Sequence, residues 1–187
     1  MRRIFLSFLL AATLSSPVHA APRPTVVELY TSEGCSSCPP ADAFLGELRQ
    51  RSDVLALAFH VDYWNELGWA DRFSLPYASA RQDRYAQTLK LSSPFTPQLI
   101  VDGQRSFIGS DRSHILSAIG AEHDGVAITI ERRGDGLRVE LGAGAAQTPA
   151  DVVLLALVPE AQTAIGRGEP RPYLAGIQHC ASELCAR

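Results

Sequence analysis

The apolar positions of this chain follow two patterns that alternate along its first third. Residues 25–32 (TVVELYTS) and 54–64 (VLALAFHVDYW) are nearly continuously apolar and rich in β-branched and aromatic side chains, as strands buried on both faces are. Between them, apolar residues of 41–48 recur at three- and four-residue steps, which predicts an amphipathic helix. Strand, helix and strand form a βαβ unit, so the two strands are expected to be parallel and joined by a right-handed crossover.

The pattern is less regular over the next thirty residues. Residues 80–91 (ARQDRYAQTLKL) predict a helix with Tyr85 and Leu89 on one face, whereas 65–79 form an insertion without a clear pattern. A hairpin is then predicted from a strand at 98–101, a turn at Asp102-Gly103 and a partner strand at 106–109. The helix expected after it has Ser110 or Asp111 as its N-cap and an apolar face of Ile115, Leu116 and Ile119.

The last third of the chain is expected to be rich in β-structure. Residues 125–144 predict a second hairpin around Gly134-Asp135-Gly136, and 151–158 (DVVLLALV) predict a strand. We therefore divide the chain into a first domain over 21–122 and a β-rich C-terminal extension over 123–187.

The first twenty residues have the features of a secretory signal peptide. Arg2 and Arg3 precede an apolar run, and Val18-His19-Ala20 has the small-x-small pattern of a cleavage site. The run is shorter than the ~20 residues of a membrane-spanning helix, and no later segment reaches that length. We expect cleavage after Ala20, a periplasmic or secreted protein, and no membrane anchor after cleavage.

Charge excludes one class of partner. The net charge is −3, and loss of Arg2 and Arg3 with the signal peptide makes it about −5, without a basic patch. Nucleic-acid binding depends on Lys and Arg residues that neutralise phosphates. We therefore expect no nucleic-acid partner.

The expected secretion changes what the four cysteines mean. In an oxidising compartment paired thiols form disulfides, and zinc thiolate sites become less common. The two-residue spacing strongly favours a Cys35–Cys38 pair, which leaves Cys180 and Cys185 as a second possible pair.

Cys35 and Cys38 lie where the first strand ends and the first helix begins. Unpaired amides and the positive end of a helix dipole stabilise a thiolate there, and in such motifs the thiol pKa can fall from ~8.5 to ~3.5–7.5. We expect Cys35 to be the exposed nucleophile and Cys38 the resolving thiol. A structural disulfide and a metal site remain alternatives. Glu33 is expected to be a solvated loop charge that opposes thiolate formation.

Four further residues end the second predicted strand: His60, Asp62, Tyr63 and Trp64. Parallel strands present their carboxyl ends at one edge of a sheet, so some of these side chains should lie near the sulfurs. Asp62 is a candidate proton acceptor for Cys38, with a turn or capping carboxylate as the alternative. His60 is as readily a structural histidine as a functional one. The aromatic residues, with Trp69, are candidates for a peptide groove, although packing is their commoner role.

Thr96-Pro97 comes immediately before the third predicted strand. Proline cannot donate to a sheet ladder and is tolerated at a strand start. Taken alone, this position favours an ordinary trans bond, because only ~5–6% of X–Pro bonds in folded proteins are cis.

Together, the strand–CxxC–helix–strand order and the later Thr-Pro, hairpin and helix resemble the thioredoxin fold over residues 25–120. The resemblance implies an α/β fold, with a central mixed sheet and helices on both faces, to which the β-rich extension is added. It also implies that the Thr96–Pro97 bond is cis, packs against the redox disulfide and holds the substrate chain.

A narrower resemblance rests on four stretches of sequence. VELYTSEGCSSCPPAD (27–42), LALAFHVDYWNELGWADRFS (55–74), TPQLIVDG (96–103) and GSD (109–111) are similar to the DUF1223 family of secreted thioredoxin-like proteins of Gram-negative bacteria. The similarity extends from Val27 to about Gly168. It strengthens the expectation for the fold and leaves the substrate open.

The expected function is thiol–disulfide exchange on exported proteins. The substrates would be protein thiols and disulfides, the partner that recycles the pair is unknown, and no organic cofactor or metal is expected. One alternative is a copper-handling chaperone that binds the metal with Cys35, Cys38 and His60. Another is a peptide-binding scaffold whose disulfide is inert.

The C-terminus departs from the family resemblance after AIGRGE (164–169). Read one base over, a GC-rich coding sequence for the last residues would give a continuation more like the family. We therefore expect a frameshifted tail from about residue 170, in which Cys180 and Cys185 are accidental. The alternative is a genuine short tail closed by a Cys180–Cys185 disulfide.

Overall fold

The computed structural model describes residues 23–121, 128–142, 152–158 and 179–186. The expected signal peptide and the first part of the expected altered tail lie outside these described residues. Along the described parts of the chain, none of the helices has the length and apolar character that a membrane crossing requires.

The order of elements follows the order expected from the sequence as far as β7, except for the 3-10 turn η1, and the strand β8 was not expected. The elements are β1 (Thr25–Thr31), α1 (Pro39–Leu48), β2 (Val54–His60), the 3-10 turn η1 (Asn65–Leu67), α2 (Pro76–Thr88), β3 (Gln98–Val101), β4 (Arg105–Ile108), α3 (Arg112–Ile119), β5 (Ile128–Arg133), β6 (Gly136–Leu141), β7 (Val152–Val158) and β8 (His179–Ala186).

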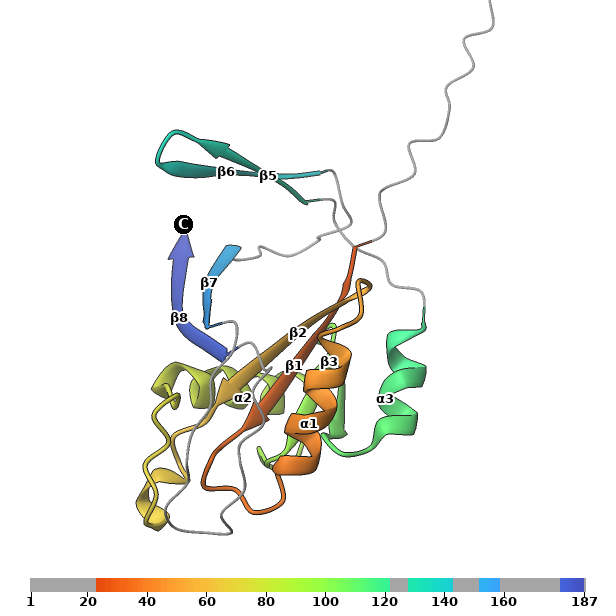
Figure 1. Ribbon diagram of the computed structural model, residues 1–187, viewed down its shortest axis with the longest axis vertical. Coiled ribbons are helices and arrows are strands. Elements are labelled where there is room, and N and C mark those ends of the chain that lie inside the picture. Colours follow the sequence, from red (N-terminus) through yellow and green to blue (C-terminus); the bar gives the residue numbers. More distant parts are fainter. Residues whose placement is uncertain (1–22, 122–127, 143–151, 159–178, 187) are drawn as a thin grey trace, which may run out of the picture.

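A mixed sheet forms the centre of the molecule (Figure 1). Its strands lie in the order β4-β3-β1-β2-β8-β7; β1 pairs with β2 in parallel and with β3 antiparallel. The register pairs Thr31 with His60, so the chain leaves both central strands at the same edge. This is a thioredoxin-like α/β fold, as expected.

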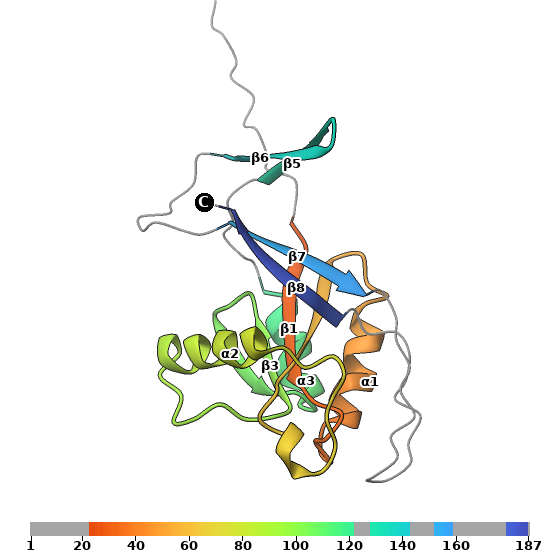
Figure 2. The same cartoon turned by 90° about the vertical axis from the view of Figure 1, so that its left-hand side faces the viewer.

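Helices cover both faces of this sheet (Figures 1 and 2). On one face α1 and α3 pack against side chains such as Leu29, Ala58 and Leu99. On the other face α2 packs over Tyr30 and Phe59, which stack on each other. Because neighbouring residues of β1 and β2 enter opposite cores, both strands are apolar almost without interruption.

A buried ion pair lies within the second core. Arg81 of α2 makes two hydrogen bonds of 2.8 Å to the Glu28 carboxylate of β1, whose residue is 3% exposed. The hydroxyls of Tyr30 and Tyr85 donate to the same carboxylate at 3.0 and 2.9 Å. The carboxylate is therefore surrounded by donors, as a buried charge requires.

The end of β2, the start of α2 and the buried face of α3 differ from those expected. β2 ends at His60, so the residues after it belong to a loop, and α2 begins at Pro76, within the stretch taken as an insertion. The N-cap of α3 is Asp111, one of the two residues expected there, and its carboxylate accepts from the His114 N–H. Leu116, expected on the apolar face, is 41% exposed; the residues at helical spacing from Ile115 fill the core instead.

The C-terminal strands belong to two different sheets. β5 and β6 form a separate hairpin around Gly134, whose positive φ of 60° suits glycine. β8 pairs with β2 and β7 and so extends the main sheet. Cys180 and Cys185 are both in β8. The Cys180–Cys185 disulfide, like the frameshifted tail, stays a prediction.

Candidate functional site

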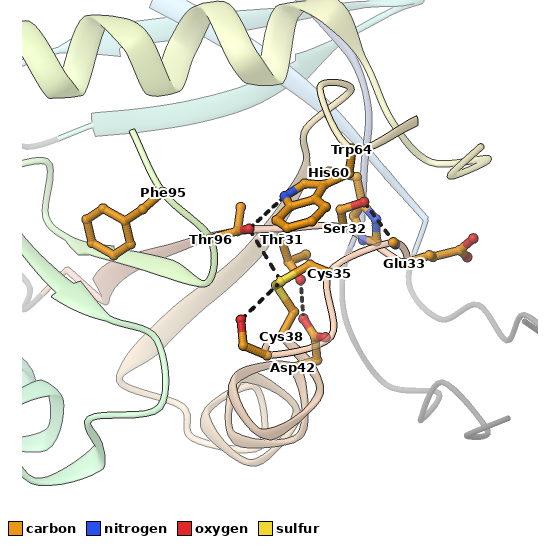
Figure 3. Close-up of a disulfide and its surroundings, with 12 residues drawn as sticks. Thr31, Ser32, Glu33, Cys35, Cys38, Asp42, His60, Trp64, Phe95 and Thr96 are labelled. Atoms are coloured by element: carbon orange, nitrogen blue, oxygen red, sulfur yellow. Dashed lines mark hydrogen bonds between the residues drawn. A yellow bond between two sulfur atoms is a disulfide. The ribbon is translucent and has the colours of Figure 1, made fainter. Parts of the chain in front are cut away.

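The candidate site is the segment that joins β1 to α1. Cys35 and Cys38 form a disulfide with a Cα–Cα distance of 5.4 Å, and Cys38 is the N-cap of α1 (Figure 3). The Cys38 N–H donates to the Cys35 carbonyl, and the Cys38 carbonyl accepts the N–H of Asp42. The pairing and its place at the helix start are as expected.

Cys35 is less accessible than expected. The residue is 3% exposed and Cys38 is fully buried. The Thr96 hydroxyl lies 3.3 Å from Cys35 Sγ, and the Ser37 hydroxyl lies 3.5 Å from the same sulfur. The expected exposure of Cys35 is therefore wrong, because the loop that carries Thr96 lies against the sulfur, whereas its role as nucleophile stays a prediction.

The start of α1 offers few backbone donors to a thiolate. Pro39 and Pro40 are its first two residues, and neither has an amide N–H. The next two amides, of Ala41 and Asp42, donate to the Cys38 carbonyl. The hydrogen bonds that the structure shows at Cys35 Sγ involve side chains, those of Thr96 and Ser37.

Thr96 lies beside the disulfide, as the thioredoxin resemblance implied. The Thr96–Pro97 bond is cis, and the Thr96 hydroxyl donates to Cys35 Sγ. The same hydroxyl accepts the indole N–H of Trp64 at 2.9 Å. Trp64 is thus one of the expected neighbours that the structure brings to the site (Figure 3).

Gly109 provides the space that this loop needs. A Cβ built on Gly109 would lie 2.8 Å from Ala41 Cβ and 3.0 Å from both Pro97 Cβ and Leu29 Cδ1. Its N–H donates to the Pro97 carbonyl at 2.9 Å. Only a residue without a side chain allows α1, β1 and the proline loop to meet at this distance.

Sequence reasoning missed Gln82. This α2 residue is fully buried, and its amide donates to the Phe95 carbonyl at 2.7 Å and to Gln98 Oε1 at 2.8 Å. Its Oε1 accepts the Tyr63 hydroxyl at 3.2 Å. The only available signal was its spacing of four residues from Ala78 and Ala86, which are also buried.

Tyr63, another expected neighbour, lies at the rim of the site. It is 44% exposed, and its hydroxyl donates to Gln82 Oε1. Partial burial raises the pKa of this phenol, and the neighbouring Gln82 and Thr96 side chains oppose the effect. Tyr63 is therefore linked through Gln82 to the loop that covers Cys35.

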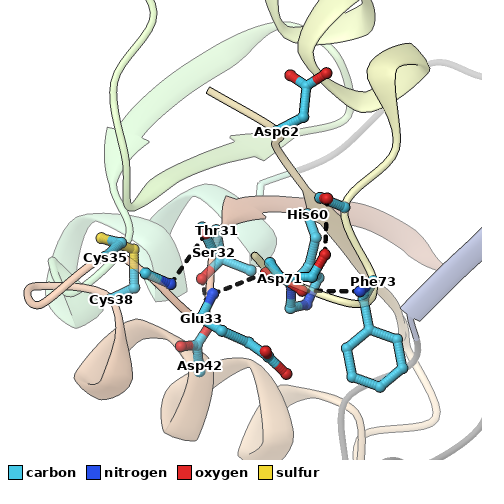
Figure 4. Close-up of polar contacts among 12 residues, drawn as sticks. Thr31, Ser32, Glu33, Cys35, Cys38, Asp42, His60, Asp62, Asp71 and Phe73 are labelled. Atoms are coloured by element: carbon cyan, nitrogen blue, oxygen red, sulfur yellow. Dashed lines mark hydrogen bonds and ion pairs between the residues drawn. A yellow bond between two sulfur atoms is a disulfide. The ribbon is translucent and has the colours of Figure 1, made fainter. Parts of the chain in front are cut away.

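His60 belongs to a separate buried cluster (Figure 4). Its Nδ1 lies 2.6 Å from Asp71 Oδ2, and that oxygen also accepts the Glu33 N–H at 2.8 Å. Burial would raise the pKa of Asp71, but the bonds from His60, Glu33 and the Phe73 N–H outweigh it, and the pKa lies below its ordinary value. His60 therefore supports the loop before Cys35 rather than the sulfur itself.

Two of the expected carboxylates are placed differently. Glu33, expected to be solvated, is 7% exposed and accepts the Trp69 indole N–H at 2.8 Å. Asp62 accepts the Ser79 hydroxyl of α2 and points away from the disulfide (Figure 4). The proton-acceptor role suggested for Asp62 is therefore wrong, because its side chain turns towards α2 as the strand ends.

Asp42 is the carboxylate that sequence reasoning overlooked. It is 5% exposed, lies four residues after Cys38 on α1, and accepts the Thr31 hydroxyl at 2.7 Å (Figure 3). Residues four apart in a helix share a face, so Asp42 is on the side of α1 that carries Cys38. Its signal was a charged residue within the apolar face of the predicted helix.

The described part of the chain contains no preformed set of metal ligands. No group of three or more His, Cys, Asp or Glu side chains there could hold a metal ion. The copper alternative required His60 beside the cysteines, but the Nδ1 of His60 faces Asp71 instead.

Comparisons with known proteins agree on the family. A family model described as "Protein of unknown function (DUF1223)" matches residues 26–174. A crystal structure of a protein from Agrobacterium tumefaciens is 31% identical, with a TM-score of 0.71 over 88% of this chain and 78% of that chain. No curated protein matches. The chain belongs to the DUF1223 family.

Proposed function

We propose that this protein is a periplasmic thiol–disulfide oxidoreductase that acts on exported proteins. The observation that carries the proposal is the disulfide at the start of α1 with the Thr96 hydroxyl 3.3 Å from Cys35 Sγ. A disulfide that only holds a turn has no need of a side-chain donor aimed at one of its sulfurs. A sulfur that becomes a thiolate is stabilised by such a donor.

The reaction requires a reduced pair, formed when a dithiol partner reduces the disulfide. The Cys35 thiolate attacks one sulfur of a substrate disulfide, and the other substrate sulfur leaves as a thiolate and takes up a proton. Cys38 then loses its proton and attacks Cys35 Sγ, which re-forms the Cys35–Cys38 disulfide and releases the second substrate thiolate. Two electrons pass from the protein to the substrate; the reverse sequence oxidises a substrate dithiol.

One buried carboxylate supports a proton acceptor for Cys38, and two exposed apolar side chains support apolar substrates. Asp42 is the buried carboxylate on the Cys38 side of α1, where it can accept the proton of the resolving thiol. Tyr63 and Leu67, 44% and 73% exposed, give the loop after β2 an apolar surface. Unfolded segments of exported proteins carry apolar side chains that such a surface would contact.

The test is the reduction potential of Cys35–Cys38. The chain from Ala21, carrying Cys180→Ser and Cys185→Ser, is equilibrated in glutathione buffers, and free thiols are trapped with a mass tag. We expect a potential between about −120 and −270 mV, the range of working oxidoreductases. The Cys35→Ser/Cys38→Ser variant controls for tagging elsewhere. A potential below about −300 mV would mean a structural disulfide and would refute the proposal.

A further inference from the structure

Trp64, Thr96 and Cys35 form a directed chain of hydrogen bonds. The indole N–H of Trp64 can only donate, and it lies 2.9 Å from Thr96 Oγ1. That hydroxyl lies 3.3 Å from Cys35 Sγ. Since the indole fills one lone pair of the oxygen, the single proton of the hydroxyl must point elsewhere, and Cys35 Sγ is within its reach.

Two acceptors compete for that proton. The Tyr63 phenol oxygen lies near Thr96 as well, while its own proton goes to Gln82 Oε1. In the disulfide form neither acceptor is charged. When the pair is reduced and Cys35 ionises, the thiolate becomes the stronger acceptor, because hydrogen bonds to charged groups are stronger than those between neutral groups.

The Thr96 loop and the Trp64 side chain are each held by contacts that do not involve the sulfurs. Gln82 fixes the carbonyl of Phe95, the residue before Thr96, at 2.7 Å. Trp64 packs against the backbone of Gly34, where an added Cβ would lie 3.3 Å from Trp64 Cβ. The donor is therefore oriented before any thiolate forms, so its orientation costs little when the sulfur ionises.

The surrounding charges make this donor important. The acidic groups on the elements around the sulfur are Glu33 in the loop before Cys35, Asp42 on α1 and Asp71 after β2, and Asp71 is paired with His60. Negative groups disfavour a thiolate, and Pro39-Pro40 remove two amides that would favour it. Ser37 offers another hydroxyl, but it lies 3.5 Å from the sulfur and its residue is exposed.

We propose that Trp64 is a positioning residue for the thiol chemistry: its indole N–H directs the Thr96 hydroxyl at the Cys35 thiolate. This inference rests on the proposed function, since it concerns the ionised state of the same sulfur. The hydrogen bond of the Trp64 indole goes to Thr96 and not to a sulfur, so Trp64 acts through Thr96.

The test is a double-mutant cycle read out on Cys35 alone. A chain with Cys38→Ser, Cys180→Ser and Cys185→Ser has one thiol, and the pH dependence of its alkylation by iodoacetamide gives the thiolate fraction. At pH values below the pKa of Cys35, we expect Trp64→Phe and Thr96→Val each to lower the thiolate fraction about three- to tenfold. In the Thr96→Val background, Trp64→Phe should have no further effect. Thr96→Ser, which keeps the hydroxyl, should keep the dependence on Trp64.

Trp69→Phe is the matched control. It also removes an indole N–H near the site, but that N–H bonds to Glu33, so its effect should be the same whether Thr96 is kept or replaced by valine. Circular dichroism and urea midpoints check that each variant folds, and a Trp64→Phe chain that does not fold is replaced by Trp64→His in the same cycle. A Trp64 effect of equal size in both backgrounds, or no effect in either, would overturn the inference.

The alkylation experiment does not depend on the proposed function. It is made on a single-thiol chain without a substrate, so an additive cycle refutes the role of Trp64 whatever the protein does. A Cys35–Cys38 disulfide that glutathione cannot reduce refutes the oxidoreductase instead.

Discussion

Replacement of Gly109 by alanine tests how closely the proline loop is packed on α1. The new Cβ would lie 2.8 Å from Ala41 Cβ, whereas carbon atoms in contact are ~3.5–4.0 Å apart. Gly109 does not have the positive φ of Gly68 or Gly103, so the cost comes from packing and not from backbone strain. Overpacking of this kind costs about 1–3 kcal/mol, which lowers the folding equilibrium constant about 5- to 150-fold.

The assay is urea unfolding of the oxidised chain from Ala21. Gly46→Ala is the matched control, because nothing lies within 4 Å of its added Cβ and alanine favours a helix by ~0.5–1 kcal/mol. Ala41→Gly removes the nearest clashing atom, so Gly109→Ala should cost less in its presence. The reasoning is refuted if Gly109→Ala unfolds at the wild-type urea concentration, or if the two substitutions are simply additive.

Three further predictions concern buried charges. Arg81→Met leaves Glu28 buried without its counter-ion and should cost about 3–5 kcal/mol in urea unfolding, with much of the loss recovered by adding Glu28→Gln; full additivity would contradict this. The pKa of Asp71 is lower in the folded protein than its unfolded-state pKa of ~3.9, so the ionised carboxylate stabilises the fold above pH ~3.9. This stability is lost as the pH falls through the folded-state pKa. The urea midpoint should therefore fall less steeply between pH 7 and 2 for Asp71→Asn than for wild type. Asp42→Asn should slow the attack of Cys38 on the mixed disulfide at least about tenfold. The mixed disulfide on Cys35 then lives longer and can be seen by acid quenching and mass spectrometry. An unchanged lifetime of the mixed disulfide would exclude Asp42 as the proton acceptor.

The elements of the first domain could be predicted because their patterns are local. The apolar runs before Cys35 and before His60, the spacing of Phe44 and Leu48, and the Asp102-Gly103 turn each indicate one element without knowledge of the rest. The place of the cysteines at the helix start follows from the same patterns. The cis bond at Thr96–Pro97 was expected only through the resemblance to thioredoxin, because its position at a strand start, taken alone, favours the trans isomer.

The surroundings of the disulfide could not be predicted in the same way. Whether Asp62 lies beside Cys38 depends on how the chain turns after β2, and the Ser79 hydroxyl of α2 holds the Asp62 carboxylate in a way that no local pattern records. Gln82 reaches the loop before Thr96 across a sequence separation of 13 residues to Phe95. Glu33 is buried because Trp69, 36 residues later, folds over it. Such pairings are properties of the assembled fold.

Asp71 belongs to the stretch between β2 and α2, which has the appearance of a removable insertion when the sequence is compared with a minimal thioredoxin fold. One of its carboxylate oxygens, however, accepts both the His60 ring and the Glu33 N–H. Deletion of this stretch would remove the Asp71 carboxylate, and with it the hydrogen bonds to His60 at the end of β2 and to the Glu33 N–H in the loop before Cys35. The insertion is therefore no separable module, and a chimera that grafts the CxxC segment onto another scaffold must carry residues 65–75 with it.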